Sequence, residues 1–101
     1  MAYLNLQAIE PVNFGGRECT PKIDAETKLR LSQIKNYNKK DCEVLASVFP
    51  DDEDYVFEFL GRMATVDIQT LHAYLLGGPT MVESVLKSVE KRLDSAMEGA
   101  K

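Results

Sequence analysis

Helix-breaking residues constrain this chain more than any other feature of its sequence. Beyond residue 24, breaks fall at Asn36–Asn38, Pro50, Gly61 and Gly77–Pro79. Proline and glycine interrupt helical hydrogen bonding, and asparagine favours turns and helix caps. The segments between the breaks carry apolar residues at helical spacing, so we expect five short helices.

Polar side chains are placed to cap the first two of these helices. Asp24 precedes a helix that runs to about residue 35, and Asn38 precedes a second helix over 39–49. In the first helix, Leu31 and Ile34 lie three residues apart and, with Leu29 beside them, form a thin apolar stripe.

A third helix is expected over residues 51–61. Its first turn would hold four carboxylates, which complement the positive N-terminal end of the helix dipole: Asp51, Asp52, Glu53 and Asp54. A structural role of this kind explains the acidic run more simply than a calcium loop, because the alternate ligand spacing and central glycine of such a loop are missing.

The last two helices have the clearest apolar stripes. Thr65 is placed to cap a helix that ends before Gly77-Gly78, and Thr80 with Glu83 forms a capping box for the final helix, to about residue 97. The final helix carries one continuous apolar stripe: Val82, Val85, Leu86, Val89, Leu93 and Ala96.

The N-terminal part of the chain has a different pattern. Residues 9–23 read as two short extended segments joined by Gly15-Gly16, a pair that tolerates the positive φ angles of a hairpin turn. A two-stranded ribbon is marginal alone and must pack on something. The fold we expect is mainly α, one domain over 1–101 in which a small N-terminal β-hairpin packs against the helical part, 24–97, with residues 1–8 and 98–101 flexible.

Composition supports a single domain that lies in the cytoplasm. The chain has 101 residues and a formal net charge of -4, and a chain of this length buries one hydrophobic core. No apolar run approaches the ~20 residues that span a bilayer, and the start, MAYLNLQAIE, lacks the features of a secretory signal. We expect no membrane partner, and Cys19 and Cys42 as reduced thiols.

The charges are unevenly distributed along the sequence. Residues 51–58 hold five acidic residues and no basic one, whereas residues 22–40 hold two acidic and six basic residues: Lys22, Lys28, Arg30, Lys35, Lys39 and Lys40. Such polarity favours self-association or a charged partner, although two solvated helix faces would also explain it. Nucleic acid is not expected, because the helix VDIQTLHAYLL of the best helix-turn-helix candidate contains no lysine or arginine.

Candidate catalytic groups are few. His72 is the single histidine and lies inside an apolar stripe, where a packing role is the simpler interpretation. No orienting signature accompanies Cys42 as a nucleophile, and neither glycine pair belongs to a phosphate-binding motif. We therefore expect no enzyme activity, no cofactor and no metal site.

Some large apolar residues lie off the helical stripes or at their margins: Phe57, Met63, Tyr74 and Met81. Together with Leu75, they are candidates for binding another protein. Completing the core of a five-helix packing is the alternative role for these residues. Asp51, Asp52 and Asp54 are candidates for a charged surface.

Three segments also suggest a family. The first segment is Asn13-Phe14-Gly15-Gly16-Arg17-Glu18. The second runs from Phe49-Pro50-Asp51-Asp52 to Tyr55-Val56 and Glu58-Phe59-Leu60, and the third is residues 67–78. Together they resemble the small tail assembly chaperones of long-tailed bacteriophages. The similarity covers roughly residues 12–92. It rests on size, acidity, element order and loose local matches, and no individual site residue can be transferred from it.

The resemblance implies a viral protein that is mostly helical and not an enzyme. Such chaperones bind the long helical tape measure protein, keep it soluble and help the tail tube assemble around it in the host cytoplasm. It also implies apolar contacts on the last two helices, and the polarised charge makes homo-oligomers possible.

Two other functions stay open at this point. A small acidic regulatory protein could bind and inhibit a basic host enzyme through its 51–58 segment. A small enzyme could use Cys42 or His72.

Overall fold

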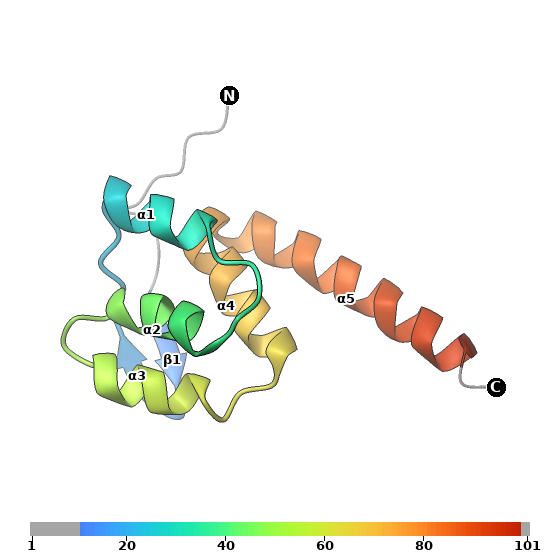
Figure 1. Ribbon diagram of the computed structural model, residues 1–101, viewed down its shortest axis with the longest axis horizontal. Helices are drawn as coiled ribbons and strands as arrows, with labels where there is room; N and C mark the ends of the chain where they lie inside the picture. The colour runs from blue at the N-terminus through green and yellow to red at the C-terminus, as the bar shows by residue number, and fades with distance from the viewer. Residues whose placement is uncertain (1–10, 100–101) are drawn as a thin grey trace.

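The computed structural model describes residues 11–99 and confirms a mainly helical fold with an N-terminal hairpin (Figure 1). The elements follow one another as β1 (Val12–Phe14), β2 (Arg17–Cys19), α1 (Ala25–Ser32), α2 (Lys39–Ser47), α3 (Glu53–Leu60), α4 (Thr65–Gly77) and α5 (Pro79–Gly99). Residues 1–8, expected to be flexible, lie outside the described residues, as do residues 100 and 101. The backbone of residues 98 and 99 is helical.

The hairpin turns at the glycine pair, as the sequence predicts. β1 and β2 are antiparallel, with Val12 opposite Cys19 and Phe14 opposite Arg17. Gly15 and Gly16 have φ angles of 54° and 90°, a region that side chains disfavour. The Gly16 N–H donates a 2.9 Å hydrogen bond to Oδ1 of Asn13, which closes the turn.

Aromatic packing fixes the hairpin on α3 and on the end of α2. Phe14 is 1% exposed and meets the rings of Phe49 and Phe59 edge-on, at centroid distances of 5.3 and 5.0 Å. The Tyr55 hydroxyl donates to the Phe14 carbonyl oxygen at 2.7 Å. Across the same surface, the Arg17 guanidinium lies 4.5 Å from the centre of the Tyr55 ring. The marginal ribbon thereby gains the packing that it needs.

The first three helices lie side by side, with α2 between α1 and α3 (Figure 1). Asp24 and Asn38 cap α1 and α2 as predicted, since their side-chain oxygens accept from the N–H groups of Thr27 and Asp41. The core that the helices enclose with the hairpin consists mainly of aliphatic and aromatic side chains: Phe14, Leu31, Ile34, Leu45, Val48, Phe49, Val56, Leu60, Ile68, Leu71 and Leu75.

The first helix is shorter than predicted, and one of its apolar residues does not face the core. α1 ends at Ser32, and the chain then turns through Tyr37, a non-glycine residue with a φ of 52°. Leu29 is 60% exposed, whereas Leu31 is fully buried. Residues two apart on a helix lie about 200° apart around its axis, so the two leucines cannot face the same core.

Three predicted helix starts were also wrong in register. α3 begins at Glu53, so its first turn holds two carboxylates instead of four, and Asp51 and Asp52 precede it. Ala64 is the cap of α4, with Thr65 already inside the helix. α5 begins at Pro79, which fits the first helical position because proline has no N–H to leave unpaired. The predicted capping box at Thr80 is therefore not formed at the N-cap.

A tight glycine turn joins α4 to α5. Gly78 has a φ of 70°, and a Cβ atom on Gly77 would lie 1.8 Å from Cγ of Met81, so neither position suits a larger residue. α4 packs on α1 and along the beginning of α5. The remainder of α5 extends well beyond the other elements (Figure 1).

Candidate functional site

The hairpin, α4 and the beginning of α5 form an open groove of about 450 Å³. Its lining comes from segments far apart in the sequence: Pro11, Val12, Asn13, Phe14, Met63, Asp67, Thr70, Leu71, Tyr74 and Val82. Three secondary-structure units must therefore be in place before the groove exists.

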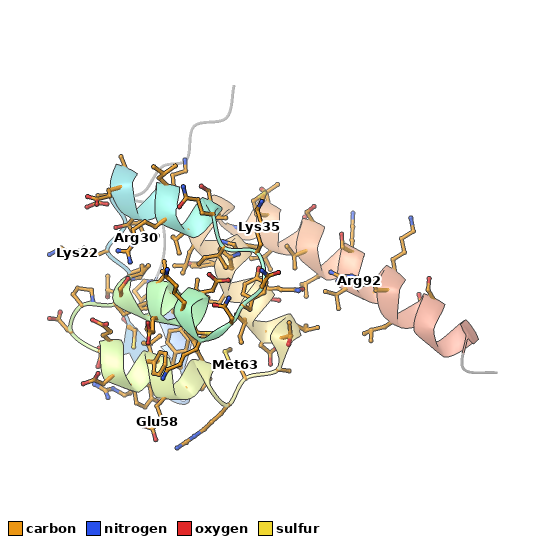
Figure 2. The ribbon with its side chains drawn as sticks, in the orientation of Figure 1. Lys22, Arg30, Lys35, Glu58, Met63 and Arg92 are labelled. Carbon is orange, nitrogen blue, oxygen red and sulfur yellow. The ribbon has the colours of Figure 1, made fainter. Side chains whose placement is uncertain are left out.

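The apolar lining combines buried core residues with half-buried side chains. Phe14 and Leu71 are buried core residues, at 1% and 6% exposure. Met63, Tyr74 and Val82 are half-buried and line the same groove. Figure 2 shows Met63 in the segment between α3 and α4. Because methionine is unbranched and polarizable, it can adjust to different apolar ligands.

The lining has few polar groups, and the side chains of Thr70 and Asn13 are hydrogen-bonded within the protein. Thr70 donates its hydroxyl to the carbonyl oxygen of Val66 at 2.9 Å, and Asn13 accepts from Gly16. Asp67 is exposed and is the charged residue among those that line the groove. The lining therefore favours an apolar ligand with a cation beside it.

The structure separates the five predicted partner-binding residues. Met63 and Tyr74 line the groove, whereas Met81, 44% exposed, lies over Gly77 and is not among the lining residues. Phe57 is half-buried against the core. Leu75 is fully buried, so it stabilises the core and offers no surface to a partner, contrary to the prediction. Spacing alone could not separate these roles, because apolar residues surround most of α4.

Sequence reasoning missed the contributions of Asp67 and Thr70 on α4 and of the hairpin. A polar residue beside an apolar stripe is ordinary in any amphipathic helix, so neither α4 residue carried a signal. Residues 11–14 reach the groove only because Phe14 anchors the hairpin, and that contact joins distant parts of the chain.

The predicted acidic surface is partly engaged within the protein. Asp52 forms an ion pair with Arg17, and its side chain is only 18% exposed. Asp51 and Asp54 are exposed. Figure 2 shows Glu58 on the outer side of α3, where it pairs with Arg62 at 2.6 Å. Lys22, Arg30 and Lys35 lie in and around α1, on the opposite side of α2 (Figure 2).

His72 links α4 to α1 and to the turn that follows α1. Its Nε2 is bonded to the carbonyl oxygen of Leu31, which can only accept, so Nε2 carries the proton. Its Nδ1 lies 2.7 Å from the Tyr37 hydroxyl and accepts from it. The two rings meet edge-on at 5.5 Å. His72 is thus a buried histidine whose two ring nitrogens are hydrogen-bonded to Tyr37 and Leu31. Neither nitrogen is hydrogen-bonded to Cys42, the candidate nucleophile.

Burial of His72 makes stability depend on pH. Burial lowers the pKa of His72 below its ordinary 6.5, although the Leu31 carbonyl and Asp41 oppose the shift. Below 6.5 the unfolded chain therefore binds a proton that the folded chain does not, and folding loses stability as pH falls. We expect the urea midpoint to decrease between about pH 7.5 and about pH 5.5. In a His72→Gln variant, the urea midpoint should change much less over this pH range. If it fell as much as in the wild type, other groups would be responsible for the pH dependence.

The thiols are poorly suited to nucleophilic chemistry. Cys19 and Cys42 are free and buried, and burial raises the pKa of both, with Asp52 adding to the shift at Cys19 and Asp41 at Cys42. A raised pKa reduces the thiolate that would react. Among the side chains that the structure describes, in residues 11–95, no three from histidine, cysteine, aspartate or glutamate cluster closely enough to hold a metal ion.

Over the described part of the chain, no helix combines the length and apolar character needed to cross a membrane.

Comparisons with known proteins identified no relative of this chain. No family model, curated protein or solved structure matches the sequence or the fold.

Proposed function

We propose that this protein is an assembly chaperone without enzyme activity or cofactor, and that its groove binds an amphipathic helix of an elongated helical protein. The observation that carries the proposal is the open apolar groove between the hairpin, α4 and α5, with a single type of charge at its rim. Helix-in-groove recognition uses apolar anchors one helical turn apart, and such anchors fit a groove of this composition.

The resemblance to phage tail assembly chaperones suggests the tape measure protein as the client, bound in the host cytoplasm. A long helical protein exposes apolar stripes until the tail tube covers them. The half-buried Met63 and Tyr74 would cover part of such a stripe, and the surrounding charge would keep the complex soluble.

The acidic-inhibitor alternative has less support. Of the three candidates for its charged surface, Asp51, Asp52 and Asp54, the second is paired with Arg17, and its side chain is mostly buried. To bind a basic enzyme, the Asp52 carboxylate would have to exchange Arg17 of the hairpin for a cation of that enzyme.

Filling the groove tests the proposal. Thr70→Arg places a long cationic side chain in the lining on a helix that tolerates arginine well. We expect client binding to weaken at least about tenfold, measured by anisotropy with labelled helical segments of a phage tape measure protein. Gln33→Arg, at the exposed end of α1, adds the same side chain away from the groove and should bind like the wild type. Equal binding by Thr70→Arg and wild type would remove the groove from the mechanism.

A further inference from the structure

The α4 side of the groove is acidic at one end and aromatic at the other. Four α4 residues line the groove at intervals of three, one and three positions, so they form one stripe on the helix: Asp67, Thr70, Leu71 and Tyr74. Asp67 lies in the first turn of α4, and Tyr74 lies about two turns further along. At 1.5 Å per residue, the two positions are about 10.5 Å apart along the helix axis. The two ends of the groove therefore differ in chemistry.

Half-buried apolar side chains stand at both ends of this stripe. Met63 directly precedes Ala64, the cap of α4, and the Asp67 N–H donates to the Ala64 carbonyl oxygen at 3.0 Å. Met63 thus belongs to the acidic end of the groove. At the other end, α5 begins directly after the turn that ends α4, which places Val82 beside the last turns of α4. Tyr74 and Val82 form the apolar end.

The negative charge of Asp67 is not paired with a cation within the described part of the chain. The ion pairs found there join other residues, Arg17 with Asp52 and Arg62 with Glu58. None of the described residues that line the groove is a lysine or arginine. Asp67 is also exposed, so its carboxylate can pair with a cation that a bound ligand brings.

We propose that Asp67 makes the groove selective for amphipathic helices that carry a lysine or arginine two turns away from an apolar anchor, the side chain seated between Tyr74 and Val82. This selectivity rests on the proposed function, because it concerns the client helix that the groove binds. Charge complementarity supports it: an apolar lining with one carboxylate matches an apolar stripe with one cation.

The distance between the two ends of the groove sets the spacing in the client. On a helix that lies along α4, residues seven positions apart share one face and are about 10.5 Å apart, the same separation as Asp67 and Tyr74. A cation three or four positions from the anchor would lie over Leu71, which is 6% exposed and carries no charge. A cation five positions away would point about 140° away from the anchor. A spacing of seven therefore brings the cation to Asp67.

Designed helical peptides of identical composition test this spacing. Each carries two leucines one turn apart and a single lysine, which stands seven positions after the outer leucine, seven positions before it, or five positions after it. By anisotropy, the tighter of the two seven-position peptides should bind the wild type about two- to fivefold more strongly than the five-position peptide, the range of an exposed charge pair. The difference should shrink as salt is added, because salt screens exposed charges.

A double-mutant cycle assigns the effect to Asp67. Asp67→Asn should weaken binding of the tighter peptide about two- to fivefold, and replacing the peptide lysine with glutamine should cost a similar factor. Asp67→Asn should have no further effect on the glutamine peptide. Glu83→Gln is the matched control, since Glu83 is exposed and next to Val82 in the sequence but is not a lining residue. It should bind the lysine peptide like the wild type.

Two results would overturn the selectivity and leave the groove as a purely apolar site. One is equal binding of the seven- and five-position peptides, and the other is an equal loss by Asp67→Asn with the lysine and glutamine peptides. Tape measure segments that bind while no designed peptide does would also overturn it. Failure of the proposed function looks different, because Thr70→Arg would then bind tape measure segments as the wild type does, or neither protein would bind them.

Discussion

Replacing Phe14 with alanine is expected to lower the free energy of unfolding by about 3–5 kcal/mol, the largest effect of a single substitution that we predict. The side chain is 1% exposed and joins the hairpin to Phe49 and Phe59 through two edge-on ring contacts. Its removal leaves a cavity where α2, α3 and the hairpin meet. The relevant measurement is equilibrium unfolding in urea.

The matched control for this substitution is Glu18→Ala on the same hairpin. Glu18 is exposed, so its replacement should change stability by no more than about 0.5 kcal/mol. Phe14→Ala should also weaken client binding, because Phe14 lines the groove. A loss of less than about 1 kcal/mol would contradict the role of Phe14 as the anchor of the hairpin.

The second large effect is expected at His72. His72→Ala should cost about 2–4 kcal/mol, since it opens a cavity between α1 and α4 and removes the proton donor that Nε2 provides to the Leu31 carbonyl. Burial raises the pKa of the Tyr37 hydroxyl, so this group stays protonated and needs an acceptor. In His72→Ala it would lose that acceptor, the Nδ1 atom of His72.

Tyr37→Phe is the control that separates the two hydrogen bonds of His72. It keeps the ring that packs edge-on against His72 and removes only the hydroxyl, so it should cost about 0.5–1.5 kcal/mol. Urea unfolding of both variants gives the comparison. If His72→Ala cost no more than Tyr37→Phe, the link to Leu31 would not contribute to stability.

Local sequence signals predicted the elements well and their ends less well. Asp24 and Asn38 cap helices because their side chains reach backbone N–H groups three residues later, a contact that sequence spacing determines. Asp51 and Asp52 looked equally suited to a first turn. Asp52 instead pairs with Arg17 on the hairpin, a contact 35 residues away that no local pattern encodes.

The burial of individual side chains was also hard to predict, because it depends on contacts between residues far apart in the sequence. Leu75 and Tyr74 are neighbours on α4, yet one is fully buried and the other lines the groove. Their difference depends on where the hairpin and α5 pack, and apolar residues around most of α4 are compatible with several orientations. The groove itself could not be read from the sequence, because its lining comes from three separate units.

The most direct test of the central claim, that the groove binds a client helix, is amide chemical-shift mapping of the isotope-labelled chain with a helical tape measure segment. The account predicts the largest shifts at the groove residues Met63, Thr70, Tyr74 and Val82. It predicts small shifts at Asp51 and Asp54. Shifts concentrated at those two acidic residues, with the groove unchanged, would contradict the account and favour an acidic surface that binds a basic partner.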